Sequence, residues 1–280
     1  MSSEVSADQS STSATIRSVG PQLIFASLLG STLGIVIAQF LDDLGDGLLA
    51  EILGGDAVLF NNRVEFSGAS DLAWAGGFLL CLIVGLIALF SYPSQRGQNL
   101  PRLTLLWMIL HVLRQAFSQA LLLPFSEDGQ LARAYDTFDA APGLDAVIAA
   151  AGGVGLALIA LGSASAFLAF APHRSKIANS RRRLVFALWI VVVPVVASVF
   201  LAIAFFSPDA GSGVIPSLPL AAVMFALTMA AAPGTTTVRG PEDERSYEWP
   251  LGLLGTVLAL LVFEVVLLRN GVSIDPTQWG

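Results

Sequence analysis

Polar residues that could do chemistry interrupt the apolar segments of this chain. One apolar segment, 103–124, carries the polar residues His111, Arg114, Gln115, Ser118 and Gln119, and another carries Glu264. An ionisable side chain inside a membrane is costly, so such residues usually face the interior of a helix bundle or a water-filled cavity. Arg114 and Glu264 fall at similar depth, and we expect them to pair. The pair would serve either a proton or substrate path or a purely structural link between two spans.

A second group of polar residues, all acidic, ends the first apolar segment. Residues 42–47 read DDLGDG, and residues 48–55 read LLAEILGG. Asp42 and Asp46 are four residues apart, so a helix that continues through them places both carboxylates on one face. Two short β-prone runs around residues 61–62, both Asn, follow and predict a hairpin. The same acids are also typical of an Asp/Gly-rich loop that ends an ordinary span.

The order of these residues resembles that of the site-2 protease family of intramembrane zinc metalloproteases. That family ends its first core span with HELGHA and then LAxxLLGG, followed by a β-hairpin and a second span carrying Ala-Gly-Pro. Here Asp42, Asp43 and Asp46 occupy the His, Glu and His positions, and residues 74–77, WAGG, stand where the family has Ala-Gly-Pro. Asp128 matches the Asp of the family's Leu-Asp-Gly element, its third zinc ligand. The residues that match as they stand are Leu44, Gly45, Ala50, Leu53, Gly54 and Gly55.

The exchanged residues change the chemistry that the resemblance implies. The metal ligands would be Asp42, Asp46 and Asp128, and the catalytic residue, if the protein is active, would be Asp43. Zinc favours imidazole and thiolate ligands, whereas an all-carboxylate set suits Mg²⁺, Ca²⁺ or Mn²⁺. We therefore expect no zinc in this protein, and an oxygen-liganded divalent cation if any metal binds. The expected protein is a non-proteolytic or chemically altered relative of the family, a pseudoenzyme rather than an enzyme.

The hairpin implies a role that needs no catalysis. In the family, the edge strand at this place binds an extended substrate by strand addition, so the resemblance implies a membrane protein or peptide as partner. The plain alternative is a short hairpin without a partner. Two further function classes stay open. One is a transporter or channel-like protein that uses Arg114 and Glu264, and the other is a structural subunit of a membrane complex.

Composition places these residues in a protein that contacts the lipid bilayer. Of 280 residues, 55% are hydrophobic and 12% are charged, which is about half the charged share of an ordinary soluble domain. This composition, with a single cysteine, excludes a soluble enzyme, a nucleic-acid binder and a disulfide scaffold. Seven runs are long and apolar enough to span a bilayer. They cover about 21–41, 71–93, 103–124, 143–171, 184–206, 215–232 and 250–268.

The predicted fold is an all-α polytopic membrane protein of about seven transmembrane helices, with a short β-hairpin after the first. Residues 1–20 form a disordered N-terminal tail. Residues 21–135 form the site-2-protease-like core of three spans plus the hairpin. Residues 136–280 hold four further spans, a basic cytoplasmic loop and a short C-terminal tail.

Positive charge predicts the orientation of the spans. The segment 172–183 holds five of the 14 Lys and Arg residues, so we place it in the cytoplasm. Alternation of the seven spans then puts ten basic residues inside and three outside, with Arg114 within a span. The expected protein is a multi-pass protein of the cell membrane, with its N-terminus in the cytoplasm and its C-terminus outside. This orientation puts the acidic motif on the outer face, whereas the protease family usually places its site toward the cytoplasm.

Overall fold

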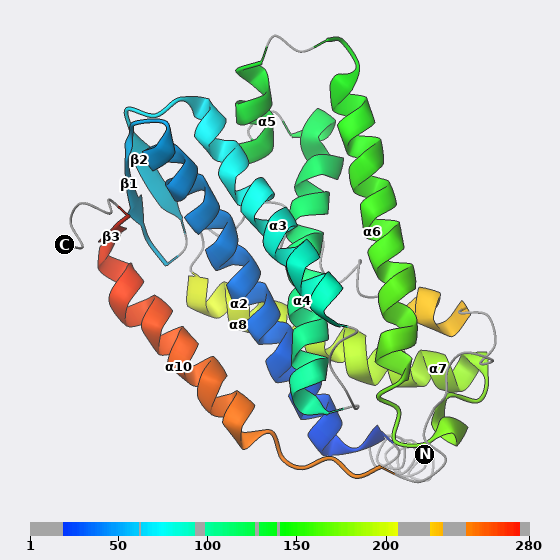
Figure 1. Cartoon of the computed structure of the whole chain (residues 1–280). Helices are drawn as coiled ribbons and strands as arrows, with labels where there is room; N and C mark the ends of the chain where they lie inside the picture. Colours follow the sequence, from blue (N-terminus) through cyan, green and yellow to red (C-terminus); the bar gives the residue numbers. More distant parts are fainter. Residues whose placement is uncertain are drawn as a thin grey trace, which may run out of the picture.

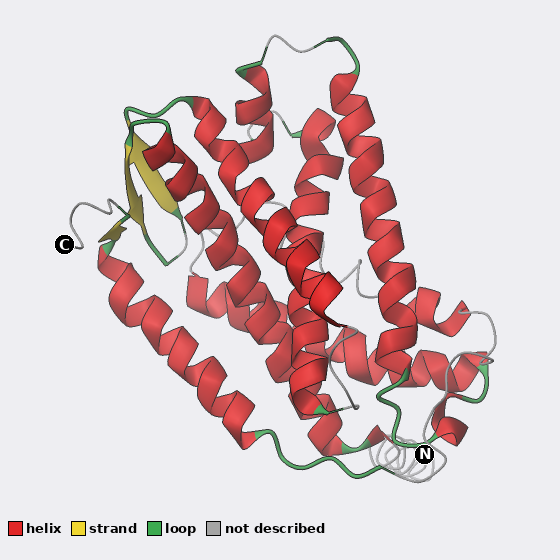
Figure 2. Cartoon of the chain, in the orientation of Figure 1, coloured by secondary structure: helices red, strands yellow, loops and turns green. Residues whose placement is uncertain are grey.

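The computed structural model describes residues 19–61, 63–92, 99–126, 129–138, 141–206, 225–231 and 245–274. They form a bundle of long helices with a small sheet at one end (Figure 1, Figure 2). Six helical segments in this part of the chain are long and apolar enough to cross a membrane. The all-α polytopic membrane fold expected from composition is therefore confirmed. The expected tail and the expected span 215–232 lie mostly outside the described residues, and residues 225–231 are helical.

The elements follow one another along the chain as helices, short helical turns and strands. The helices are α2 (Pro21–Ile52), α3 (Gly76–Ser91), α4 (Leu100–Leu122), α5 (Gln130–Asp136), α6 (Leu144–Leu168), α7 (Ser180–Ala187), α8 (Val193–Phe206) and α10 (Leu251–Leu267). The turns are η1 (Asp71–Ala75), η3 (Leu123–Phe125), η4 (Arg174–Ile177), the π-helical η5 (Leu188–Val192) and η7 (Leu268–Asn270). The strands are β1 (Asp56–Leu59), β2 (Val64–Ser67) and β3 (Val272–Ser273).

Helix α2 does not end at the acidic motif but continues through it. Its 32 residues extend about 48 Å at 1.5 Å per residue, well beyond a hydrocarbon core of about 30 Å. The helix stops where Gly54 adopts a positive φ of 84°. The amide of Gly54 donates to the carbonyl of Glu51, and that of Gly55 donates to the carbonyl of Ala50, both at 3.0 Å. This is the Schellman pattern, so residues 52–55, ILGG, act as a helix stop.

The predicted hairpin is confirmed, and the chain adds a third strand to it. Strands β1 and β2 pair antiparallel, from Asp56 opposite Ser67 to Leu59 opposite Val64. Strand β3 pairs antiparallel with the other edge of β1, which gives the sheet order β2-β1-β3. Just beyond β3, the amide of Ile274 donates to the carbonyl of Ala57 at 3.1 Å. The sheet therefore joins the end of α10 to the end of α2.

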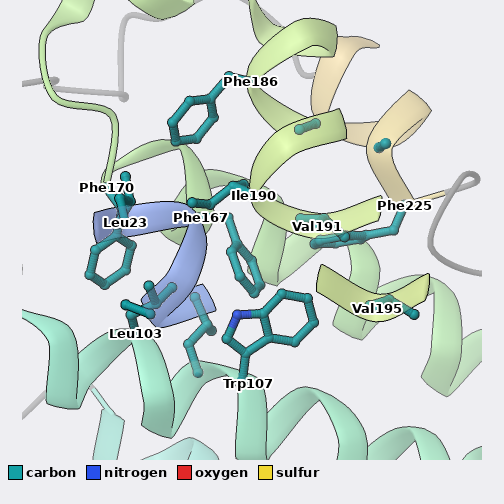
Figure 3. Packing of buried hydrophobic residues seen from close by; sticks show 14 of the residues in the cluster. Leu23, Leu103, Trp107, Phe167, Phe170, Phe186, Ile190, Val191, Val195 and Phe225 are labelled. Carbon is teal, nitrogen blue, oxygen red and sulfur yellow. The ribbon is translucent and has the colours of Figure 1, made fainter. Parts of the chain in front are cut away.

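The largest hydrophobic core surrounds Trp107 of α4, at the other end of α2 from the sheet (Figure 3). The Trp107 ring packs edge-on against Phe167 of α6, with centroids 4.9 Å apart. Leu23 of α2 and Ile190 of η5 belong to the same cluster and are fully buried. Because α2 and α4 pack directly on each other, this core fixes which faces of the two helices meet.

Pro194 perturbs the fifth span. A proline has no N–H, so it cannot donate to the carbonyl four residues before it. That carbonyl belongs to Ile190, and it accepts a hydrogen bond of 2.6 Å from the hydroxyl of Ser27 instead. The helix is π-helical over η5, which ends two residues before this proline. The polar face of α2 thus compensates a backbone defect in a neighbouring span.

Candidate functional site

The acids of the DDLGDG sequence lie on the buried side of α2. Asp42, Asp43 and Asp46 are 2%, 4% and 0% exposed. The side-chain amide of Gln115 donates to Oδ2 of Asp42 at 2.9 Å, and that of Gln119 donates to Oδ1 at 2.7 Å. Both carboxylate oxygens of Asp42 are therefore bonded to glutamines of α4.

The other two acids each have one bonded oxygen. The backbone amide of Gly77 donates to Oδ1 of Asp46 at 2.6 Å. Oδ2 of Asp46 is buried and has no hydrogen-bond partner among the described residues. Gln39, one helical turn before Asp43, donates its side-chain amide to Oδ2 of Asp43 at 3.1 Å. Glutamine amides and one backbone amide thus surround the three carboxylates.

Glycines bring the backbone of α3 to this face of α2. A Cβ atom on Gly45 would lie 2.6 Å from the carbonyl carbon of Gly76, and one on Gly77 would lie 3.0 Å from that of Asp42. Real Cβ atoms do not approach other atoms so closely, so a larger residue at either position would force the helices apart. The contact of glycine with glycine is what allows the amide of Gly77 to reach Asp46.

The polar residues of α4 join the acids of α2 in one network. The guanidinium of Arg114 donates to Oε1 of Gln115 at 3.1 Å, and the other end of the same amide donates to Asp42. Gln115 therefore links a cationic side chain to a carboxylate. Two groups that the sequence presents separately, the intramembrane residues and the DDLGDG motif, meet at this glutamine.

His111 takes part in a separate contact. Its Nε2 lies 3.2 Å from the hydroxyl of Ser31, and its ring stacks on Trp107 with centroids 5.4 Å apart. The imidazole is 1% exposed. A Cβ on Gly34 would lie 2.9 Å from the carbonyl oxygen of Trp107. Glycine at position 34 therefore lets α2 and α4 approach closely beside the imidazole.

The expected pair of Arg114 and Glu264 is not formed. No ion pair joins these two among the residues that the structure describes. Glu264 is 3% exposed, and its Oε1 is buried without a hydrogen-bond partner in the described part of the chain. Helix α10, which carries Glu264, packs on α2 (Figure 1). Similar depth in the membrane did not make the two residues neighbours, because their helices are separated by α2.

The donor set around the acids does not fit zinc. Among the described residues, no three His, Cys, Asp or Glu side chains converge into a metal site. His111 is bonded to Ser31, and both oxygens of Asp42 are bonded to amides. Asp128 lies outside the described residues, so the three-aspartate site remains a prediction. A hard cation would find its free oxygens at Oδ2 of Asp46 and Oε1 of Gln119, which are buried without partners in the described part of the chain.

Two members of the site were not singled out by the sequence. Gln39 could have been found from its spacing, because a glutamine four residues before an aspartate meets it on a helix surface. The amide of Gly77 carries no such signal, since a backbone donor depends only on how two helices cross.

Comparison with known proteins identifies no relative of this chain. No family model, curated protein or solved structure matches it.

Proposed function

We propose that this chain is a non-proteolytic integral membrane protein built on a site-2-protease-like core. A carboxylate–amide cluster stands where that family holds its zinc. The cluster comprises Asp42, Asp43, Asp46, Gln39, Gln115, Gln119 and the backbone amide of Gly77. The observation that carries the proposal is the double hydrogen bond from glutamines to Asp42. A catalytic zinc keeps three protein ligands and an open position for water. At Asp42 the two glutamine amides already occupy one lone pair of each carboxylate oxygen, which leaves a metal only the second.

The residue at the position of the catalytic base supports the same function. Asp43 is shorter by one methylene than the family's Glu, and it accepts a hydrogen bond from Gln39. A general base works only when the proton it removes lies within hydrogen-bond reach. Because the surrounding donors do not fit zinc, Asp43 has no zinc-activated water to deprotonate. The cluster then acts as a polar fastening between α2, α3 and α4.

The order of the elements supports the proposed kinship. A long helix bearing the acidic motif is followed by a glycine stop, a hairpin and a second helix. Gly76 and Gly77 of this second helix pack on Gly45 and Asp42 of the motif. These contacts are those expected if residues 74–77 correspond to the family's Ala-Gly-Pro element.

The sheet supports a role in binding a membrane partner at the outer edge of β2. The chain's own β3 covers one edge of β1. Among the described residues, the outer edge of β2 has no strand paired to it. An extended segment of a membrane protein or peptide would add to β2 by backbone hydrogen bonds.

Metal content and cleavage together test the loss of zinc proteolysis. The full chain is purified in detergent with zinc present, and bound zinc and cleavage of labelled casein are measured. We expect substoichiometric zinc and the same background cleavage for the natural chain and for Asp43→Ala. Asp136→Ala, which removes an exposed acid of α5, is the matched control. Stoichiometric zinc with cleavage that Asp43→Ala abolishes would contradict the proposal.

Ion transport is the second candidate, and one observation favours it. Glu264 is buried in a spanning helix with one oxygen unpartnered among the described residues, and intramembrane carboxylates without a counter-ion often mark ion or proton pathways. The chain is reconstituted into vesicles that hold a pH-sensitive dye, and an ion gradient is applied. Transport predicts a flux that Glu264→Gln lowers and Glu248→Gln, at an exposed position, does not. Vesicles no leakier than protein-free ones would remove this candidate.

A further inference from the structure

The end of the bundle opposite the sheet carries a concentrated positive charge. It lies in the connection between α6 and the fifth span, close to α7 in Figure 1. The segment 172–183 has no acidic residue. Its basic residues are Arg174, Lys176, Arg181, Arg182 and Arg183. We call these five residues the basic surface.

The basic surface is built on an ordered backbone. The guanidinium of Arg182 donates to the carbonyl of Ser175 at 2.7 Å, which ties α7 to η4. The side chain of Asn179 caps α7 by accepting from the amide of Arg182 at 2.9 Å. The ring of His173 caps η4 by accepting from the amide of Ser175 at 3.1 Å. The two short elements that carry the basic residues are therefore held side by side.

Arg183 is the unusual member of this surface. It is 8% exposed, whereas arginine is rarely buried unless it is paired. Its Nη2 donates to the hydroxyl of Ser180 at 3.2 Å, at the first residue of α7. Its Nε is buried and has no hydrogen-bond partner among the described residues. A buried guanidinium with an unfilled donor, held at a helix N-terminus, is suited to an anionic acceptor.

We propose that the basic surface binds the phosphate of an anionic phospholipid headgroup, with Arg183 and the first turn of α7 as its centre. The guanidinium fork matches the oxygens of a phosphate, and charge-assisted hydrogen bonds of this kind are the stronger ones. The lipid is the source of the phosphate because the surface joins two spanning helices, which places it at headgroup depth. The proposal is independent of the function proposed for the carboxylate–amide cluster.

Lipid-dependent stability tests the proposal on the full chain. The protein is delipidated in a neutral detergent, and its thermal unfolding midpoint is measured with added phosphatidylglycerol, phosphatidylcholine or inorganic phosphate. Phosphatidylglycerol at saturating concentration is expected to raise the midpoint by about 5 °C. Phosphatidylcholine and inorganic phosphate are expected to raise it far less. Equal shifts with the two lipids would overturn the proposal, as would a full shift with inorganic phosphate alone.

Three variants locate the effect. Arg183→Lys keeps the charge but removes the planar fork, and it is expected to lose most of the shift caused by phosphatidylglycerol. Lys176→Gln with Arg181→Gln is expected to lose a large part of the shift while leaving the buried arginine in place, so it decides the matter if Arg183→Lys does not fold. Arg63→Gln, at the sheet end, is the charge-matched control and should keep the full shift. An undiminished shift in the double variant would overturn the proposal.

One further outcome would mean that acidic residues of the chain itself, and not a lipid, occupy the basic surface. The acidic run 242–244 lies outside the described residues and precedes Arg245, whose amide donates to the carbonyl of Pro172 at 2.9 Å. If these acids fill the site in place of a lipid, phosphatidylglycerol gives no shift with the natural chain. That result would also overturn the proposal.

Discussion

The N-terminal half of α2 carries three buried hydroxyl side chains, whereas its C-terminal half carries three buried carboxylates. Both halves use polar side chains to contact neighbouring helices at the centre of the bundle. They differ in how completely those side chains are bonded. Both halves fasten α2 to its neighbours, but this difference marks only the C-terminal half as a candidate for function.

The hydroxyl half is fully bonded. Ser27 donates to the carbonyl of Ile190 at 2.6 Å and accepts from the indole of Trp107 at 2.8 Å. The hydroxyl of Thr32 lies 3.1 Å from that of Ser198. A hydroxyl carries no net charge, so these bonds join helices without burying an ion. We infer that the N-terminal half of α2 has a structural role.

The carboxylate half is only partly bonded. Asp42 has a partner for each oxygen, but Oδ2 of Asp46 is buried and has none among the described residues. Burying a carboxylate without enough hydrogen bonds lowers the stability of the folded state by roughly several kcal/mol. Incompletely bonded carboxylates in a spanning helix therefore lower the stability of the fold. Polar groups that are kept at such a cost are typical of a functional site.

The largest expected effect belongs to the hydroxyl half. Trp107→Ala removes a fully buried ring and the donor to Ser27, and we expect it to lower the free energy of unfolding by about 4 kcal/mol. Trp249→Ala, at a ring that is 55% exposed, is the control and should cost far less. Reversible unfolding in mixed micelles measures both. Similar losses for the two variants would show that the core around Trp107 is not the main source of stability.

A somewhat smaller effect is expected in the carboxylate half. Asp42→Ala leaves the amides of Gln115 and Gln119 without their acceptor, and we expect a loss of about 3 kcal/mol. Asp136→Ala is the control, because it removes an exposed acid. The same unfolding experiment measures the difference. If Asp42→Ala were as stable as the natural chain, the cluster would not fasten α2 to α4, and the contrast between the halves would be sharper still.

The smallest expected effect concerns the pair that the structure does not form. Because no ion pair joins Arg114 and Glu264 in the part of the chain that the structure describes, a double-mutant cycle with Arg114→Leu and Glu264→Leu should give a coupling energy below about 0.5 kcal/mol. The unfolding free energies of the natural chain, the two single variants and the double variant supply the cycle. Recovery of stability in the double variant, relative to Arg114→Leu alone, would mean that the two side chains do interact.

Local features of the fold were predictable from particular residues. The two asparagines at positions 61 and 62 predicted the hairpin between β1 and β2, which is confirmed. The spacing of Asp42 and Asp46 predicted that both would share a face of a continuing helix, and α2 does continue through them. These predictions succeed because helix periodicity and turn chemistry act over a few residues.

The candidate site was predictable only in part. The sequence indicated His111, Arg114 and Gln115 as polar residues within a span, but it could not show that Gln115 bonds Asp42. It also gave no signal for β3, whose two residues pair with β1 across more than two hundred positions. A strand of two residues has no hydrophobic period of its own, so its place depends on the partner that it meets.

By itself, the sequence determined that the chain is a membrane protein, where its apolar helices lie, and which rare polar residues they carry. The tertiary structure alone decided which of those residues meet: glutamines of α4 with Asp42, the amide of Gly77 with Asp46, and Glu264 beside α2 rather than beside Arg114. The physical reason is that composition and spacing set the depth and face of each residue along its own helix. The neighbour of that face is set by close packing between helices, here by glycines at 34, 45, 76 and 77 that let backbones touch.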